Sequence, residues 1–124
     1  MRSAMIVLVV LGMTLAISAA AQHRSLIRFY TVNDRGQESL IKLVLNTDEP
    51  GCHAFPISRK VHRVAVIGFE YCAVFATRDC EAGSEVSALW KKKPDETNTR
   101  FHPGSQWYLD PEGEVEISAW RCEG

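Results

Sequence analysis

Four cysteines and four histidines are the side chains of this chain best suited to metal binding, redox chemistry or acid–base catalysis. No two cysteines form a C-x-x-C motif, so the spacings of thioredoxin-like and zinc-ribbon sites are absent. These cysteines could form disulfides, and the alternative is a metal site that combines Cys52 and His53 with Cys80. The histidines are scattered, with no H-x-H or H-x-x-x-H pair, and lie at His23, His53, His62 and His102. The even number of cysteines favours two disulfides over metal binding.

The first 21 residues indicate whether the chain is exported from the cell. Arg2 is followed by an unbroken apolar and small-residue run that ends in Ala19-Ala20-Ala21, before Gln22. This pattern is typical of a cleaved secretory signal peptide. The alternative is a membrane anchor, but the strongly apolar part, residues 5–17, is shorter than the ~20 residues that span a bilayer. We therefore expect a signal peptide over 1–21, a secreted extracellular product without a stable membrane span, and one domain over 22–124.

Secretion, size and charge narrow the class of protein further. Small secreted domains bury little core and are often stabilised by disulfides. Loss of residues 1–21 leaves 13 basic and 15 acidic residues, and this balance does not favour nucleic-acid binding. No cofactor is expected.

Strand patterns dominate the mature chain, and no stretch of ten residues predicts a helix. Apolar and β-branched runs predict strands, with turn residues between them, at 26–32, 39–45, 61–69, 71–77, 84–90 and 114–120. Alternation places Ile41, Leu43 and Leu45 on one face of their strand. In the last strand, Val115, Ile117 and Ala119 are predicted to face away from Trp120.

The two halves of the mature chain resemble each other. Residues 27–45 align without a gap over 72–90, placing Asp34 on Asp79 and Ser39 on Ser84. Each half continues into a Pro-Gly pair, at 50–51 and 103–104, and ends in another apolar strand. We interpret this as a duplicated four-strand unit, over about 26–67 and 71–122, whose copies pair as a β-sandwich. A chance likeness between two hairpins is the alternative.

The order of an aromatic strand, an Asp/Gly turn, a Ser and an apolar strand resembles the Greek-key motif of the βγ-crystallin superfamily. The resemblance covers about 27–122 and implies an all-β fold, with two Greek-key motifs forming a small disulfide-stapled β-sandwich. It implies that Gly36 and Gly83 adopt conformations that other residues resist, and that Ser39 and Ser84 hold the folded hairpins. The layout is also similar to small secreted crystallin-like proteins of filamentous fungi.

The same resemblance bears on the cysteines and on calcium. In the family the first and fourth strands of a unit are neighbours, and third strands are exchanged between sheets, which implies Cys72–Cys122 and Cys52–Cys80 bridges. Sequence alone leaves three pairings, and Cys72–Cys80 within one hairpin is the alternative. The positions that match the family's calcium ligands, 60–65 and 114–119, lack the paired pattern, so no metal is expected.

The remaining expectation is a non-catalytic binding protein, acting as a host-interaction effector or antimicrobial factor on an extracellular protein or glycan. The chain is expected to be a monomer. The candidate binding surface comprises Trp107, Tyr108, Lys91, Lys92 and Lys93, with core packing of the large aromatics as the alternative.

Two other functions are alternatives. One is a protease inhibitor that presents the loop 91–100. The other is a small secreted ribonuclease, for which the acid–base residue types are present in His53, His62, Arg63, Glu70 and His102. No G-x-S-x-G motif indicates a serine hydrolase, and no catalytic residue is assigned.

Overall fold

The computed structural model describes residues 25–45, 51–93 and 95–124, and the predicted signal peptide lies outside these ranges. Within them the chain forms nine β-strands and no helix. The strands are β1 Leu26–Val32, β2 Glu38–Leu45, β3 Gly51–Val61, β4 Arg63–Ile67, β5 Tyr71–Phe75, β6 Ala88–Trp90, β7 Thr97–Asn98, β8 Gly104–Tyr108 and β9 Val115–Glu123.

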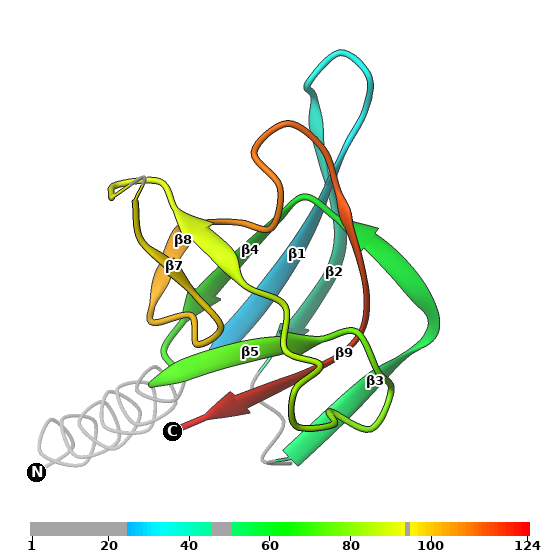
Figure 1. Cartoon of the computed structure of the whole chain (residues 1–124), viewed down its shortest axis with the longest axis vertical. Helices are drawn as coiled ribbons and strands as arrows, with labels where there is room; N and C mark the ends of the chain where they lie inside the picture. The colour runs from blue at the N-terminus through cyan, green and yellow to red at the C-terminus, as the bar shows by residue number, and fades with distance from the viewer. Residues whose placement is uncertain (1–24, 46–50, 94) are drawn as a thin grey trace, which may run out of the picture.

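The strands form two antiparallel sheets (Figure 1). The larger sheet has the order β2-β1-β4-β8-β6-β7, and the smaller has the order β3-β9-β5. Strand β3 comes from the first half of the chain but pairs with β9, and β8 comes from the second half but pairs with β4. The small sheet therefore combines one strand of the first half with two of the second, and the six-stranded sheet takes three strands from each half, joined at β4 and β8.

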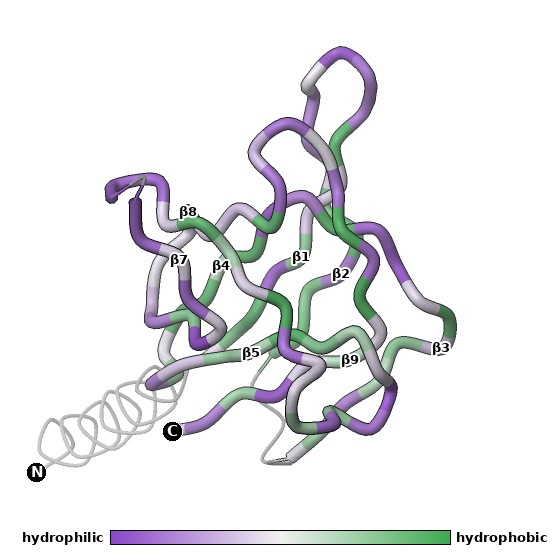
Figure 2. Tube along the Cα trace, viewed as in Figure 1, coloured by the Kyte–Doolittle hydropathy of each residue, from purple (hydrophilic) through white to green (hydrophobic). Residues whose placement is uncertain are grey.

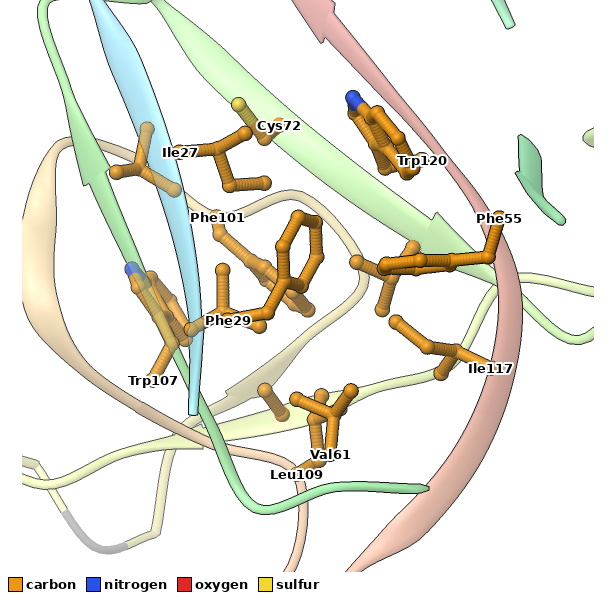
Figure 3. Close-up of a cluster of buried hydrophobic side chains, with 14 of the residues drawn as sticks. Ile27, Phe29, Phe55, Val61, Cys72, Phe101, Trp107, Leu109, Ile117 and Trp120 are labelled. Carbon is orange, nitrogen blue, oxygen red and sulfur yellow. The ribbon is translucent and has the colours of Figure 1, made fainter. Parts of the chain in front are cut away.

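The core lies between the two sheets (Figure 3). Phe29 of β1, Phe55 of β3 and Trp120 of β9 form its aromatic centre. The Phe29 and Phe55 ring centroids are 5.1 Å apart, and Phe55 and Trp120 are 4.8 Å apart. The alternation of β1 explains how it reaches this core, because Ile27 and Phe29 are both buried while their neighbours are only partly covered.

Strand β2 departs from the predicted alternation. The register between β1 and β2 shifts at Phe29/Tyr30, so that Ile41 is an extra residue in β2. Ile41 packs against the core, whereas Leu43 and Leu45 are exposed on the opposite face. The prediction that these three side chains share one face is wrong, because a β-bulge shifts the alternation by one residue.

A second register break changes the alternation of β9. The pairing with β3 is interrupted opposite Ser118. Ile117 and Trp120, three residues apart, therefore both reach the core, while Ala119 packs with Phe75 in a separate cluster. The prediction that Trp120 faces away from Ile117 is wrong for this reason, and so is the grouping of Ala119 with Ile117.

The two aligned hairpins are stabilised differently. Gly36 and Gly83 both have positive φ, 77° and 94°, in line with the expectation for these residues. The Ser84 hydroxyl donates to the carbonyl of Glu81 at 2.8 Å. Ser39 is exposed, and its hydroxyl makes no hydrogen bond within the described residues, so its expected role is wrong. In the first turn the Asn33 side chain accepts two backbone N–H groups instead.

All four cysteines form disulfides, Cys52–Cys80 and Cys72–Cys122. These are the pairs that the family resemblance implied, and the Cys72–Cys80 alternative does not form. Cys72 of β5 lies directly opposite Cys122 of β9 in the ladder. The other bridge joins β3 to the hairpin between β5 and β6, and so connects the two halves.

Candidate binding surface

Trp107 belongs to the core and not to a surface. Its side chain is 0% exposed, and its ring stacks on Phe101 at a centroid distance of 5.1 Å (Figure 3). The indole N–H donates to the carbonyl of His102 at 2.9 Å. The prediction that Trp107 forms part of a binding surface is wrong, because Trp107 pairs with Val64 on the inward-facing side of the ladder. Core packing was the alternative expectation.

The other predicted surface residues are divided between two places. Tyr108 follows Trp107 and faces the other side of the sheet, where the Lys91 ammonium lies 5.6 Å from its ring centroid. Lys92 instead lies 5.9 Å from the ring of Trp90, which is itself buried. Lys93 is exposed in the turn after β6. Of the five predicted surface residues, therefore, only Tyr108 and Lys91 lie together on one surface. Residues of the neighbouring strands continue that surface.

That surface is the outward side of the six-stranded sheet, here called the outer face. In its central row Arg63 is the cross-strand neighbour of both Tyr30 and Tyr108. The Arg63 guanidinium carbon lies 4.1 Å from the Tyr30 ring centroid. By the register of the strands, the outer face includes Leu26, Arg28, Tyr30, Val32, Glu38, Leu40, Leu43, Leu45, Arg63, Ala65, Ile67, Leu89, Lys91 and Tyr108.

The outer face is unusually apolar for a surface. The exposed fractions are 51% for Leu40, 43% for Leu43, 60% for Leu45 and 43% for Ile67. Within the described residues only one other large apolar side chain is exposed to this extent, Ile57 of β3. Scattered apolar residues are normal on a protein surface, but a contiguous group of them indicates an interaction site.

Arg63 holds a fixed position in the middle of the outer face. Its Nε and Nη2 donate to the Glu38 carboxylate at 2.7 and 3.3 Å, and its Nη1 donates to the carbonyl of Ser105. Burial of the guanidinium opposes its charge. The hydrogen bond and the charge of Glu38, with smaller contributions from Tyr108 and Tyr30, outweigh burial and raise the pKa of Arg63. Arg63 is therefore always charged, and Glu38 compensates that charge.

Two other cations on the outer face are not compensated in this way. Arg28 stands beside Leu43 in the ladder, and Lys91 lies against Tyr108. In the described part of the chain neither forms an ion pair, because both ion pairs found there involve Glu38. The outer face therefore combines exposed aliphatic groups with positive charge.

Of the residues of the ribonuclease alternative, His62 and Arg63 both lie against Glu38, with His62 Nε2 at 3.8 Å and Arg63 Nε at 2.7 Å from its carboxylate, whereas the histidines are placed against different rings and carbonyls. His53 stacks on Trp120, and His102 contacts Trp90 edge-on. His62 is buried, and its Nδ1 lies 2.7 Å from the carbonyl of Gly113. No two of these histidines share a contact among the described residues. The Cys52–His53–Cys80 metal alternative is excluded, because both sulfurs are in the same disulfide.

Sequence reasoning missed the outer face because it treated β2 as half-buried. A signal was present: residues 38–45, ESLIKLVL, carry apolar side chains at both alternating positions. A half-buried strand needs apolar residues at only one of them. The alignment of Tyr30, Arg63 and Tyr108 requires the exchanged position of β8, which no local pattern reveals.

Comparison of the chain with protein-family models, curated proteins and solved structures finds no match. No helix in the described residues is long and apolar enough to cross a membrane.

Proposed function

We propose that this chain is a secreted, non-catalytic binding protein that docks an extracellular protein through its outer face. The observation that carries the proposal is the exposure of Leu40, Leu43 and Leu45 beside the Tyr30–Arg63–Tyr108 row. Exposed aliphatic groups around a well-ordered Tyr/Arg cluster match the composition of protein-binding hot spots.

The chemistry of the outer face favours a protein partner over a glycan. Sugars stack on open aromatic ring faces, whereas the guanidinium of Arg63 lies over the ring of Tyr30. The aliphatic side chains instead match an apolar patch on another protein. Arg28 and Lys91 would be complementary to acidic groups at the rim of that patch. The proposed partner is therefore an extracellular protein with an apolar, acid-rimmed surface.

The fold is proposed to be a pair of Greek-key units of βγ-crystallin type. The pairing of β3 with β9 and of β8 with β4, each between the two halves of the chain, supports this reading, as do the positive φ angles of Gly36 and Gly83. The apolar leader of residues 1–21 and the two disulfides support secretion. The resemblance of the sequence pattern to small secreted crystallin-like proteins of filamentous fungi is the ground for proposing a role in host interaction or microbial antagonism.

The test has two steps. A photo-crosslinking probe at Leu40 captures the partner protein, and interferometry then measures the affinity of this chain for the purified partner. Wild-type chain is expected to bind, and Leu43→Asp is expected to lose at least ~1.4 kcal/mol, a tenfold loss of affinity. Ile57→Asp places the same charge on an exposed aliphatic site off the outer face and is expected to retain binding. Equal affinity of Leu43→Asp and wild type would reject the outer face as the binding surface.

A further inference from the structure

A second exposed site lies in the middle of β3, at the other large apolar residue. Ile57 is 77% exposed, the highest value among the large apolar side chains of the described residues. It sits in the segment Phe55–Ser58, where β3 loses its register with β9. Figure 1 shows β3 bowing outward at this point, and Figure 2 shows an apolar stretch at the bow followed by a hydrophilic one.

The backbone of this segment is held from behind. Nη1 of Arg78 donates to the carbonyl of Phe55 at 2.8 Å and to the carbonyl of Pro56 at 3.0 Å. Arg78 belongs to the hairpin between β5 and β6, and the Cys52–Cys80 disulfide joins this same hairpin to β3. Arg78 thus replaces the ladder hydrogen bonds that β9 does not supply here.

Both ends of the segment are also anchored. The Phe55 ring is buried in the core against Phe29 and Trp120. On the other side the Ser58 and Ser118 hydroxyl oxygens are 2.6 Å apart. Pro56 restricts its own φ and limits the conformation of Phe55. The result is an extended backbone that is fixed at both ends and from behind, with only Pro56 and Ile57 presented to solvent.

An extended, exposed and already ordered backbone is the form in which endoprotease clefts bind peptide chains. A flexible peptide loses conformational entropy when it binds, and a pre-ordered segment avoids much of that cost. Should the peptide bond after Ile57 be cut, the Arg78 hydrogen bonds, acting together with the core anchor and the Ser58 contact, would keep the two new ends together. Such a segment acts as an inhibitor, because the cleft is occupied and the products do not leave.

We propose that Phe55–Ser58 binds in the substrate cleft of an extracellular endoprotease, with Ile57 in a specificity pocket that accepts branched aliphatic side chains. This segment is separate from the outer face, and its use does not depend on the proposed function above. The proposed inhibitory segment also differs from the loop 91–100, which the sequence predicts as the segment that a protease inhibitor would present.

Inhibition constants of residues 22–124, measured with chromogenic substrates against an elastase-type protease and trypsin, test the proposal. Wild-type chain is expected to inhibit the elastase-type enzyme. Ile57→Arg is expected to weaken that inhibition by about 100-fold and to create inhibition of trypsin. The reason is that the specificity pocket of the elastase-type enzyme accepts aliphatic side chains, whereas the pocket of trypsin accepts basic ones. Leu43→Asp is the matched control and is expected to inhibit like wild type.

Arg78→Ala tests the role of the brace. Without the two hydrogen bonds the segment is expected to be cut after Ile57 and released, so that the variant becomes a substrate, detected by mass spectrometry. Circular dichroism verifies that each variant is folded. The proposal is overturned if wild type inhibits neither enzyme, if Ile57→Arg leaves the inhibition profile unchanged, or if wild type is cut as fast as Arg78→Ala. None of these outcomes bears on Leu43-dependent partner binding.

Discussion

Arg63 links three separate parts of the chain through one guanidinium group, which contacts Glu38 of β2, Ser105 of β8 and the ring of Tyr30. Replacement by Met removes all three contacts and leaves the Ser105 carbonyl without its donor. We expect Arg63→Met to lower the free energy of unfolding by about 1–3 kcal/mol, measured in urea. Arg63→Lys is expected to recover only part of this, because an ammonium lacks the planar set of donors.

The pH dependence of that loss follows from the raised pKa of Arg63. A base whose pKa is raised on folding contributes stability that is complete below its unfolded-state pKa and is lost only as the pH rises through the folded value. The stability difference between wild type and Arg63→Met is therefore expected to be equal at about pH 7.5 and about pH 9, both far below the range in which arginine titrates. A difference that shrinks over this interval would contradict the assignment.

Gly104 is required by a neighbouring ring. A Cβ at this position would lie 2.3 Å from Cη2 of Trp90, and φ is +156°. Gly104→Ala must displace a buried indole and is expected to cost about 1–3 kcal/mol. Gly113→Ala is the control, since its Cβ would meet only the side-chain carboxylate of Asp110, with Oδ2 at 3.0 Å and Cγ at 3.5 Å. Gly104→Ala is expected to alter the near-UV circular dichroism spectrum and to lower the free energy of unfolding measured in urea. Gly113→Ala is expected to leave both unchanged.

At the scale of elements, the aligned serines of the two hairpins give a matched pair of variants. Ser84 hydrogen-bonds to Glu81 and to the hydroxyl of Thr77, whereas Ser39 makes no side-chain hydrogen bond among the described residues. Ser84→Ala is therefore expected to cost about 1 kcal/mol, and Ser39→Ala close to nothing. Thermal unfolding of both variants measures the difference. Equal costs would mean that the two hairpins are held in the same way.

The two disulfides are expected to differ in what they protect. The Cys72–Cys122 bridge closes a separation of 50 residues and Cys52–Cys80 one of 28, and the chain-entropy model assigns them about 4.1 and about 3.6 kcal/mol. Although the two losses of stability are similar, only the Cys52→Ala/Cys80→Ala variant should release the hairpin that braces β3. Limited trypsin digestion should then cut at Arg59 and Lys60, which stay protected in Cys72→Ala/Cys122→Ala under folding conditions.

Some elements could be predicted from sequence, and others could not. The predicted strand 26–32 coincides with β1, because Ile27 and Phe29 alternate with less apolar residues. Strands β3 and β8 were not delimited, since Pro56 and the polar residues around it break any alternation in β3. The outward turn of Leu43 was also missed. It depends on a bulge at the contact with β1, and a bulge is a property of two paired strands.

At the scale of the whole molecule, the pairing of β3 with β9 and of β8 with β4 makes the two halves depend on each other. Residues 25–70 alone would lack β8 beside β4, and residues 71–124 alone would lack β3 beside β9. Far-UV circular dichroism is expected to show that each isolated fragment is unfolded. Calorimetry is expected to show a single unfolding transition for the intact chain. A folded isolated fragment, or two separate transitions, would show that the halves are independent.

The place of β8 between β4 and β6 also has a consequence for synthesis. The first half of the chain is complete long before Gly104–Tyr108 is made, and until then β4 has an unpaired edge. The ladder of β3 waits still longer, because its partner β9 is the last of the described strands to be made. Neither sheet can therefore close before the strand that completes it, β8 or β9, has been made. A product that stops before Gly104 keeps open strand edges, the feature that leads incomplete chains to chaperones or to aggregation.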